Sequence, residues 1–207
     1  MSIAAQRLPL AGTCVIERSS GVAAAYAGRL LAALGCETIM VEGPDGSPLR
    51  REPPLLQGAG GQSALFAYLA AGKRSMVCDL SSAAGRATLE RQLRRADILI
   101  DDTPLADRVA AGLDAEDLAQ RFPQLIHASV LPFGAFGDKA WWTAEEINLI
   151  HAGGEGFLLP NGLSNELFPD RPPLKIYGHF AEYQGGVVAA LGALAALWAR
   201  PSTGGQF

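Results

Sequence analysis

Cysteine is scarce in this sequence of 207 residues, where it occurs three times, at Cys14, Cys36 and Cys78. These positions are widely spaced and fall inside predicted strands or at a helix end. Disulfide-stapled domains and zinc sites instead carry cysteines at short, regular spacings. We therefore expect reduced, buried thiols, and the pattern predicts neither a disulfide framework nor a metal site.

Histidine is equally rare, and His127, His151 and His179 are scattered along the chain. Their spacing does not match that of metal ligands. We expect each of them to be a hydrogen-bonded structural residue. His179, which stands three positions before Glu182, is also a candidate for tuning the ionisation of that glutamate.

Positive charge is not in excess, since 17 basic residues stand against 21 acidic ones and the net charge is −4. The sequence has no basic stripe of the kind that binds a nucleic-acid backbone, which excludes a nucleic-acid partner. The N-terminus lacks a basic segment followed by a long apolar core and a cleavage signature. We therefore expect no secretory signal and a cytoplasmic location.

The uncharged run near the C-terminus is short for a membrane. Val187 to Ala199 spans 13 residues, whereas a membrane crossing needs roughly 20. The run is apolar around its whole circumference, which predicts a buried helix or a subunit-contact helix and no membrane partner.

Strand and helix patterns alternate from the start of the chain. Thr13–Glu17 and Glu37–Glu42 are apolar, β-rich runs, and the alanine-rich stretch Val22–Leu34 lies between them. Two strands joined by a crossover helix must pair in parallel within a buried sheet. Ligands of such sheets gather at the carboxyl ends of the strands. The turns Ser19–Ala23 and Glu42–Pro44 are therefore the first candidate sites.

The same alternation continues through the middle of the chain, and 49% hydrophobic residues suffice for the core of one large domain. The pattern predicts a doubly wound, mostly parallel, Rossmann-like α/β sheet flanked by helices, with a long apolar C-terminal helix. The further predicted segments are a loop at Pro44–Gly61, helices at Ser63–Ala71, from Ser81 or Ser82 to about Arg95, from Asp114 to before Pro123, at Ala144–Ala152 and at Glu182–Arg200, and strands at Ser75–Cys78, Ile98–Ile100 and Leu125–Val130.

A set of ordered motifs follows this pattern. They are Leu10–Gly12 (LAG), Tyr26–Gly35 (YAGRLLAALG), Ile39–Pro44 (IMVEGP), Gly72–Ser75 (GKRS) with Asp79 and Leu80, Ala96–Ile100 (ADILI) and Thr203–Gln206 (TGGQ). In this order they resemble the motifs of the family III CoA-transferases over essentially the whole chain. The resemblance implies an enzyme that moves CoA between an acyl-CoA thioester and a free carboxylic acid, with no permanently bound cofactor. A carboxylate of such enzymes attacks the thioester and passes through an anhydride to an enzyme-bound CoA thioester.

The nucleophile of that family is an aspartate in an Ala-Asp-x-x-x-Gly segment before the long apolar helix. Phe180–Gly186 (FAEYQGG) matches this segment, so the resemblance implies that Glu182 is the catalytic carboxylate, on a stem longer by one methylene. The residues alone leave another interpretation open, a first-turn glutamate that the helix dipole favours. Gly185 and Gly186 would either let backbone amides approach the substrate or allow tight helix packing.

The resemblance also implies a set of CoA contacts. They are Ser20, Gly21, Val22, Ala23, Cys78, Ser81, Asp102, Thr103 and Arg108. Basic residues that meet the CoA phosphates in relatives are mostly replaced here, for example by Gly43. Lys73 and Arg74 remain, but a basic pair at a helix-to-strand turn more often is solvated or pairs with carboxylates.

Two further segments bear on the reaction. Glu145 stands where the racemase branch of the family has a catalytic histidine, which argues against racemisation. Trp141 and Trp142 either cover the acyl pocket or, as we expect, anchor a packed loop.

Members of the family are about twice as long, with a second domain after the Thr-Gly-x-Gly-Gln turn and two interlocked subunits. We therefore expect residues 1–207 to form a single N-terminal domain without that second domain, as a fragment, an engineered piece or one half of a split enzyme. The expected partners are an acyl-CoA, a carboxylic acid, and a second subunit in a homodimer or in a heteromer with a related chain. The alternatives are a catalytically inert half that supports a catalytic partner, and a generic nucleotide-binding module. The lack of G-x-G-x-x-G after the first strand disfavours the latter.

Overall fold

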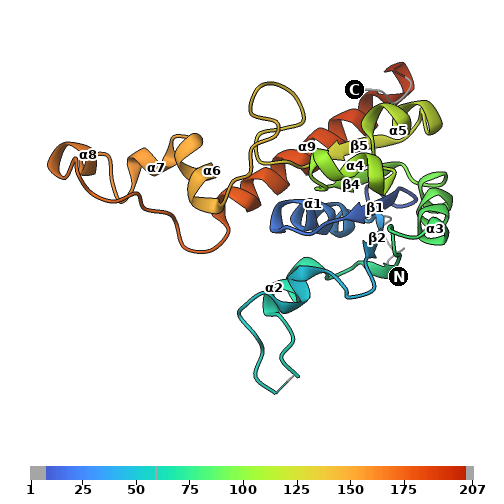
Figure 1. The fold of residues 1–207 in the computed structure, drawn as a ribbon, viewed down its shortest axis with the longest axis horizontal. Coiled ribbons are helices and arrows are strands. Elements are labelled where there is room, and N and C mark those ends of the chain that lie inside the picture. The colour runs from blue at the N-terminus through green and yellow to red at the C-terminus, as the bar shows by residue number, and fades with distance from the viewer. Residues whose placement is uncertain (1–7, 59, 204–207) are drawn as a thin grey trace, which may run out of the picture.

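A computed structural model describes residues 8–58 and 60–203 of the chain. Within these residues five parallel strands form one sheet in the order β3-β2-β1-β4-β5. Figure 1 labels β1, β2, β4 and β5 of this sheet. The strands are β1 (Cys14–Arg18), β2 (Glu37–Glu42), β3 (Arg74–Val77), β4 (Ile98–Asp101) and β5 (Ile126–Ser129). The chain winds outward from β1 through β2 to β3 and then returns to place β4 on the other side of β1. This order confirms the predicted doubly wound α/β fold.

Helices connect the strands and continue beyond β5. They are α1 (Val22–Ala33), the 3-10 helix η1 (Pro48–Arg51), α2 (Ala64–Leu69), α3 (Ala83–Leu93), α4 (Leu105–Ala111), α5 (Ala115–Arg121), α6 (Glu146–Ala152), α7 (Glu155–Leu158), α8 (Ser164–Leu167) and α9 (Phe180–Thr203). Side-chain caps begin several of them; for example, Ser82 accepts the N–H of Gly85, and Asp114 accepts the N–H groups of Glu116 and Asp117. Ser82, and not Ser81, is therefore the cap of α3, and the predicted cap at Asp114 is confirmed.

The two faces of the sheet bury different sets of side chains. Val15 and Ile98 pack with α1 and α9 on one face, whereas Ile16 and Leu99 pack with α3 and α5 on the other. Successive residues of a strand point to opposite faces, so a strand covered on both sides is mainly apolar, as Cys14–Ile16 of β1 and Ile98–Ile100 of β4 are. The carboxylates buried at the ends of these strands, Glu17 and Asp101, are each paired with a cation.

The long C-terminal helix α9 packs against α1 and completes one face of the core (Figure 1). Its small residues Ala190, Ala193 and Ala196 are buried in that core. Its 24 residues exceed the apolar run predicted from the sequence, and its length and composition alone would allow it to cross a membrane. Core helices of soluble proteins meet the same criterion. The absence of a membrane partner stays a prediction. Of the Thr203–Gln206 motif, only Thr203 lies within the described residues.

The sequence pattern missed several short helices. The expected loop Pro44–Gly61 contains η1, which Ser47 caps and Pro48 begins. Helix α4 follows Pro104 and ends at Gly112, which has a left-handed φ of 71°. The four residues of η1 are too few to show an apolar period, and α4 has no side-chain cap to mark its start. Helices α7 and α8 have four residues each and lie with α6 away from the sheet (Figure 1).

An ion pair between Lys73 and Glu17 is fully buried beneath the sheet's carboxyl edge. The Lys73 Nζ lies 2.6 Å from Glu17 Oε2 and both side chains are 0% exposed. Lys73 also donates to the carbonyl of Ala25 at 2.7 Å. Arg74, the second member of the basic pair, bonds the exposed Glu37. The expectation that these two cations pair with carboxylates is confirmed.

Glu42, at the end of β2, is engaged by its own surroundings. Its carboxylate accepts hydrogen bonds from Arg50 Nε at 2.6 Å, Ser75 Oγ at 2.5 Å and the backbone N–H of Ser47 at 2.7 Å. The bond from Arg50, followed by those from Ser75 and Ser47, lowers the pKa of Glu42 to about 2 against the cost of burial. The candidate turn at Glu42–Pro44 therefore carries a structural carboxylate that joins β2, β3 and η1.

The three cysteines are buried and free, which confirms the expectation of reduced, buried thiols. Burial raises the pKa of Cys36 to about 11, so its thiol stays protonated at neutral pH. Cys78 donates its S–H to the carbonyl of Gly85 at 3.0 Å.

Candidate active site

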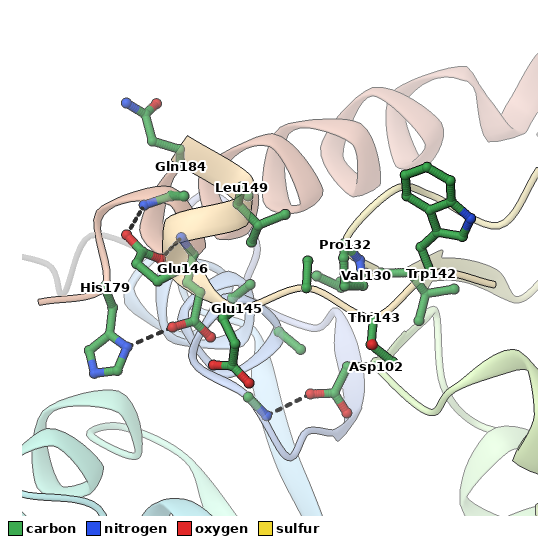
Figure 2. A pocket seen from close by; sticks show the side chains of 18 of the residues that line it. Asp102, Val130, Pro132, Trp142, Thr143, Glu145, Glu146, Leu149, His179 and Gln184 are labelled. Atoms are coloured by element: carbon green, nitrogen blue, oxygen red, sulfur yellow. Dashed lines mark hydrogen bonds and ion pairs between the residues drawn. The ribbon is translucent and has the colours of Figure 1, made fainter. Parts of the chain in front are cut away.

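A cleft of about 1030 Å³ opens at the carboxyl edge of the sheet. Its walls come from the loops after β1, β4 and β5, from α6 and from the first turn of α9 (Figure 2). The loops after β1 and β4 diverge here because the strand order reverses between these two strands. Such a topological switch point is where ligands bind in doubly wound sheets.

Asp102, the first residue after β4, bridges the switch point. Its carboxylate accepts the backbone N–H groups of Ser20 and Gly21, each at 2.7 Å, and the Ser20 hydroxyl at 3.2 Å (Figure 2). Burial raises the pKa of Asp102, while the hydrogen bonds from Gly21 and Ser20 oppose that shift. The turn that precedes α1 is thus already occupied by an acidic group of the chain itself.

Glu182 lies beside the same turn, in the first turn of α9. Its Oε1 accepts the N–H of Val22 at 3.3 Å. Its Oε2 lies 2.6 Å from Nδ1 of His179, a contact drawn as the dashed line at His179 in Figure 2. The side chain is 26% exposed and lines the cleft. The first N–H groups of a helix favour a negative charge, and here the N-terminus of α1 provides one of them to Glu182.

The start of α9 is held by Glu146, a residue that the sequence reasoning did not single out for this role. Its carboxylate accepts the N–H of Ala181 at 2.7 Å and that of Glu182 at 3.2 Å. A helix N-terminus leaves such N–H groups without a partner, so a carboxylate placed there caps it. No local signal could have found this contact, because Glu146 belongs to α6, more than thirty residues earlier in the chain.

The neighbouring Glu145 begins α6, and its backbone N–H donates to Asn148 Oδ1 at 2.8 Å. Glu145 lines the cleft. The resemblance implies that the racemases of the family have a histidine at this position. A carboxylate therefore stands in this wall of the cleft, next to the carboxylate that caps α9.

The predicted site residues separate into two groups. Ser20, Gly21, Ala23, Asp102 and Glu182 line the cleft, and Val22 contributes its N–H to Glu182. The other four do not line it: Cys78, Ser81, Thr103 and Arg108. As CoA contacts, all of these residues stay predictions.

Arg108, the one cation among the expected CoA contacts, is turned inward. It is 3% exposed, and its guanidinium donates to the Thr103 carbonyl at 2.9 Å and to Ser129 Oγ at 2.6 Å. It also lies 3.3 Å from the buried carboxylate of Asp101. Ser81, by contrast, is exposed and bonds the side chain of Asp79 at 2.6 Å.

Trp141 and Trp142 both line the cleft and are 69% and 56% exposed. The Trp142 ring meets Phe133 edge-on, with 5.8 Å between ring centroids, and Lys139 lies over its face. We expected the two tryptophans to anchor a packed loop. This expectation is wrong, because more than half of each residue is exposed to solvent. Their position fits the other interpretation, a wall for an apolar group in the cleft.

The other two histidines are hydrogen-bonded as expected. His127 lies 3.4 Å from Asp101, and Nε2 of His151 lies 2.9 Å from the Leu174 carbonyl. Within residues 8–58 and 60–203, no group of three or more histidine, cysteine or acidic side chains is arranged to hold a metal ion.

The fold and the cleft together define a doubly wound α/β protein with a carboxylate at its ligand-binding edge. Comparison with known families is more specific. The model of "CoA-transferase family III" matches residues 10–206. The chain belongs to this family.

Several individual proteins resemble the chain. The succinate–glutarate CoA-transferase of Agrobacterium fabrum is 36% identical over 172 residues, which is 81% of this chain and 41% of that protein. The acetyl-CoA:oxalate CoA-transferase of Acetobacter aceti is 31% identical, over 95% of this chain and 48% of the relative. The chain thus spans about half the length of the curated relatives it matches.

A solved structure confirms the fold. The crystal structure of a CAIB/BAIF family protein from Brucella suis is 32% identical and superposes with a TM-score of 0.84. The match covers 96% of this chain and 51% of that one. The resemblance that the ordered motifs indicated is therefore confirmed both by sequence comparison and by the fold.

Proposed function

We propose that this chain carries the nucleophile of a CoA-transferase, which moves CoA from an acyl-CoA thioester to a free carboxylic acid. The nucleophile is Glu182. The observation that supports this assignment is the position of its carboxylate on the wall of the switch-point cleft, 3.3 Å from the Val22 nitrogen. Family membership supplies the reaction type, and the cleft supplies a carboxylate where a ligand would bind.

The reaction balances with carboxylates and thiolates alone. An oxygen of Glu182 attacks the thioester carbon, the carbon–sulfur bond breaks, and CoA leaves as a thiolate while a mixed anhydride forms. The thiolate then attacks the Glu182 carbonyl carbon, releasing the donor acid as its carboxylate and leaving CoA on Glu182 as a thioester. The acceptor carboxylate repeats these steps in reverse. No electron acceptor and no net proton transfer is needed.

Backbone N–H groups support each attack. The oxygen that becomes negative in a tetrahedral intermediate needs donors that are fixed in advance. Val22 at the N-terminus of α1 supplies one donor next to Glu182. An added Cβ at Gly185 would meet only the Ala23 Cβ, at 3.7 Å, so this part of the cleft wall is open to a substrate group.

The turn Ser20–Ala23 is the proposed approach for the CoA arm, as the resemblance implies. Asp102 already holds the N–H groups of Ser20 and Gly21, so this turn does not offer them to a phosphate. We propose that cations for the CoA phosphates come from a second domain or from a second subunit. The relatives are about twice as long as this chain, which leaves room for such a contribution.

An exchange assay tests this function. The chain, expressed together with any partner region or subunit that it works with, is incubated with an acyl-CoA and a second, isotopically labelled carboxylic acid, and labelled acyl-CoA is measured. Exchange is expected, and the variant Glu182→Gln is expected to lose it because an amide is a far weaker nucleophile. Glu166→Gln, which changes an exposed carboxylate on α8 outside the cleft, serves as the matched control.

The second candidate function is that of an inert half that supports a catalytic partner. Two observations favour it: Arg108 and Lys73 are both committed to buried carboxylates, and Asp102 occupies the turn before α1. Calorimetry with CoA discriminates between the two. Micromolar binding by this chain contradicts the inert alternative, whereas exchange that persists in Glu182→Gln contradicts the catalytic one.

A further inference from the structure

We propose that His179 is a positioning residue that holds the Glu182 carboxylate in its attacking orientation. The inference rests on the proposed function and adds a residue to it. Nδ1 of His179 lies 2.6 Å from Glu182 Oε2, a distance typical of a charge-assisted hydrogen bond. His179 lies immediately before α9, lines the cleft, and has a side chain that is 29% exposed.

The two oxygens of Glu182 are held from opposite sides. Val22, the first residue of α1, donates its N–H to Oε1. His179, the residue that precedes α9, contacts Oε2. A single contact would leave the carboxylate free to rotate about its last bond, whereas two contacts fix its plane. Each carboxylate oxygen offers about two acceptor positions, so each oxygen keeps one lone pair for attack on a thioester.

The need for a second contact follows from the side chain itself. Glutamate has one more rotatable bond than the aspartate that the resemblance places at this position, and each additional rotamer must be restricted before reaction. Reacting atoms must be positioned to well within an ångström for full rate. His179 thus compensates for the longer stem at Glu182.

The hydrogen bond also fixes which imidazole nitrogen carries hydrogen. An ionised carboxylate accepts only, so Nδ1 of His179 must donate. The groups around the pair agree with this arrangement. The ring of Tyr183 meets His179 edge-on with 6.5 Å between centroids, and the carboxylate of Glu146 is directed to the α9 N–H groups instead.

Matched variants test the kinetic consequence in the same exchange assay. His179→Leu removes the donor, whereas His179→Asn retains an N–H near the position of Nδ1. We expect His179→Leu to lower kcat about 10-fold or more with little change in KM for the acyl-CoA, and His179→Asn to recover most of that loss. His151→Asn, an exposed histidine outside the cleft, is the control and should behave as wild type.

A spectroscopic measurement on the 207-residue chain gives a second readout. Long-range proton–nitrogen NMR correlations distinguish hydrogen at Nδ1 from hydrogen at Nε2, and three single variants assign the three histidine signals. We expect His179 to carry hydrogen at Nδ1 in wild type and to lose that preference in Glu182→Ala. An Nε2–H signal in wild type that Glu182→Ala leaves unchanged overturns the pairing.

The failures of the two proposals are distinguishable. If wild type exchanges CoA and Glu182→Gln does not, but His179→Leu keeps the wild-type kcat, the positioning role is refuted and the function stands. If wild type does not exchange CoA under any substrate condition, the proposed function fails, and with it any catalytic role of His179. Loss of kcat in His179→Leu that His179→Asn restores supports both.

Discussion

The carboxylate of Asp102 lies 2.7 Å from the backbone nitrogen of Gly21 and thereby ties the end of β4 to the start of α1. The N-terminus of a helix stabilises negative charge, whether the charge belongs to a side chain or to a bound anion. In this chain the Asp102 carboxylate occupies the start of α1. The effect of removing it can be measured.

Replacing Asp102 with alanine should lower stability and expose an anion site. The variant Asp102→Ala loses a cap that accepts the Ser20 and Gly21 N–H groups, which we expect to cost about 1–2 kcal/mol of unfolding free energy. Phosphate should then raise the Tm of the variant more than that of wild type, because the freed N–H groups can bind it. Asp107→Ala, an exposed position on α4, is the control, and an equal phosphate response in Asp102→Ala and wild type would contradict the prediction.

The lowered pKa of Glu42 predicts that part of the free energy of unfolding is lost in acid. Its pKa is lowered from an ordinary value of 4.5 to about 2, chiefly by the hydrogen bond from Arg50. Since the folded pKa lies below the unfolded one, the stabilisation is fully present above pH 4.5 and is lost as pH falls toward 2. Between pH 4.5 and pH 2, the free energy of unfolding measured in urea should fall less in Glu42→Gln than in wild type. The control variant Glu52→Gln replaces an exposed carboxylate. Its free energy of unfolding should change with pH as that of wild type does.

Gly185 and Gly186 should respond very differently to the same substitution. A Cβ at Gly186 would lie 2.6 Å from the Ala23 carbonyl oxygen and 3.0 Å from the Tyr26 Cβ, whereas one at Gly185 meets ordinary contact at 3.7 Å. Gly186→Ala should therefore push α9 away from α1, lower stability by roughly 1–3 kcal/mol and displace Glu182. Gly185→Ala should leave stability at the wild-type level or raise it by up to ~1 kcal/mol, as alanine favours the helix. Equal thermal stabilities of the two variants would contradict the close packing of α9 on α1.

Gly28 allows the buried ion pair of Lys73 and Glu17 to form. A Cβ at Gly28 would occupy the space of Glu17 Oε2, only 1.7 Å away. Gly28→Ala should therefore break the pair and destabilise the fold by about 3–5 kcal/mol. Gly192→Ala, in α9 with nothing within 4 Å of the added Cβ, should stabilise by ~0.5–1 kcal/mol. Chemical denaturation that places both variants within error of wild type would refute this account of Gly28.

Much of the fold could be predicted from sequence because its signals are local. Thr13–Glu17 and Glu37–Glu42 are apolar enough to be recognised as doubly buried strands, and they correspond closely to β1 and β2. Asp114 and Ser82 cap their helices through neighbours two or three residues away. Helix α4 was missed because no side-chain cap marks its start, whereas Asp114 marks that of the equally short α5.

The site was predictable only in part, because its contacts join distant segments. The pairing of Asp102 with Gly21 spans 81 residues and that of Glu146 with Ala181 spans 35. No spacing rule connects such positions. Arg108 was expected to face the CoA phosphates, but the buried Asp101 draws it inward, and a sequence does not reveal which of several carboxylates a cation will choose. The contact of His179 with Glu182 was within reach, because the two residues are three positions apart.

The central claim is that Glu182 is the nucleophile, and covalent trapping tests it most directly. The protein preparation used in the exchange assay is mixed with an acyl-CoA, the intermediate is captured with hydroxylamine or borohydride, and the modified peptide is identified by mass spectrometry. The account predicts modification at Glu182 that depends on acyl-CoA and is absent in Glu182→Gln. Full turnover with an unmodified Glu182, or with the label on another carboxylate, contradicts it.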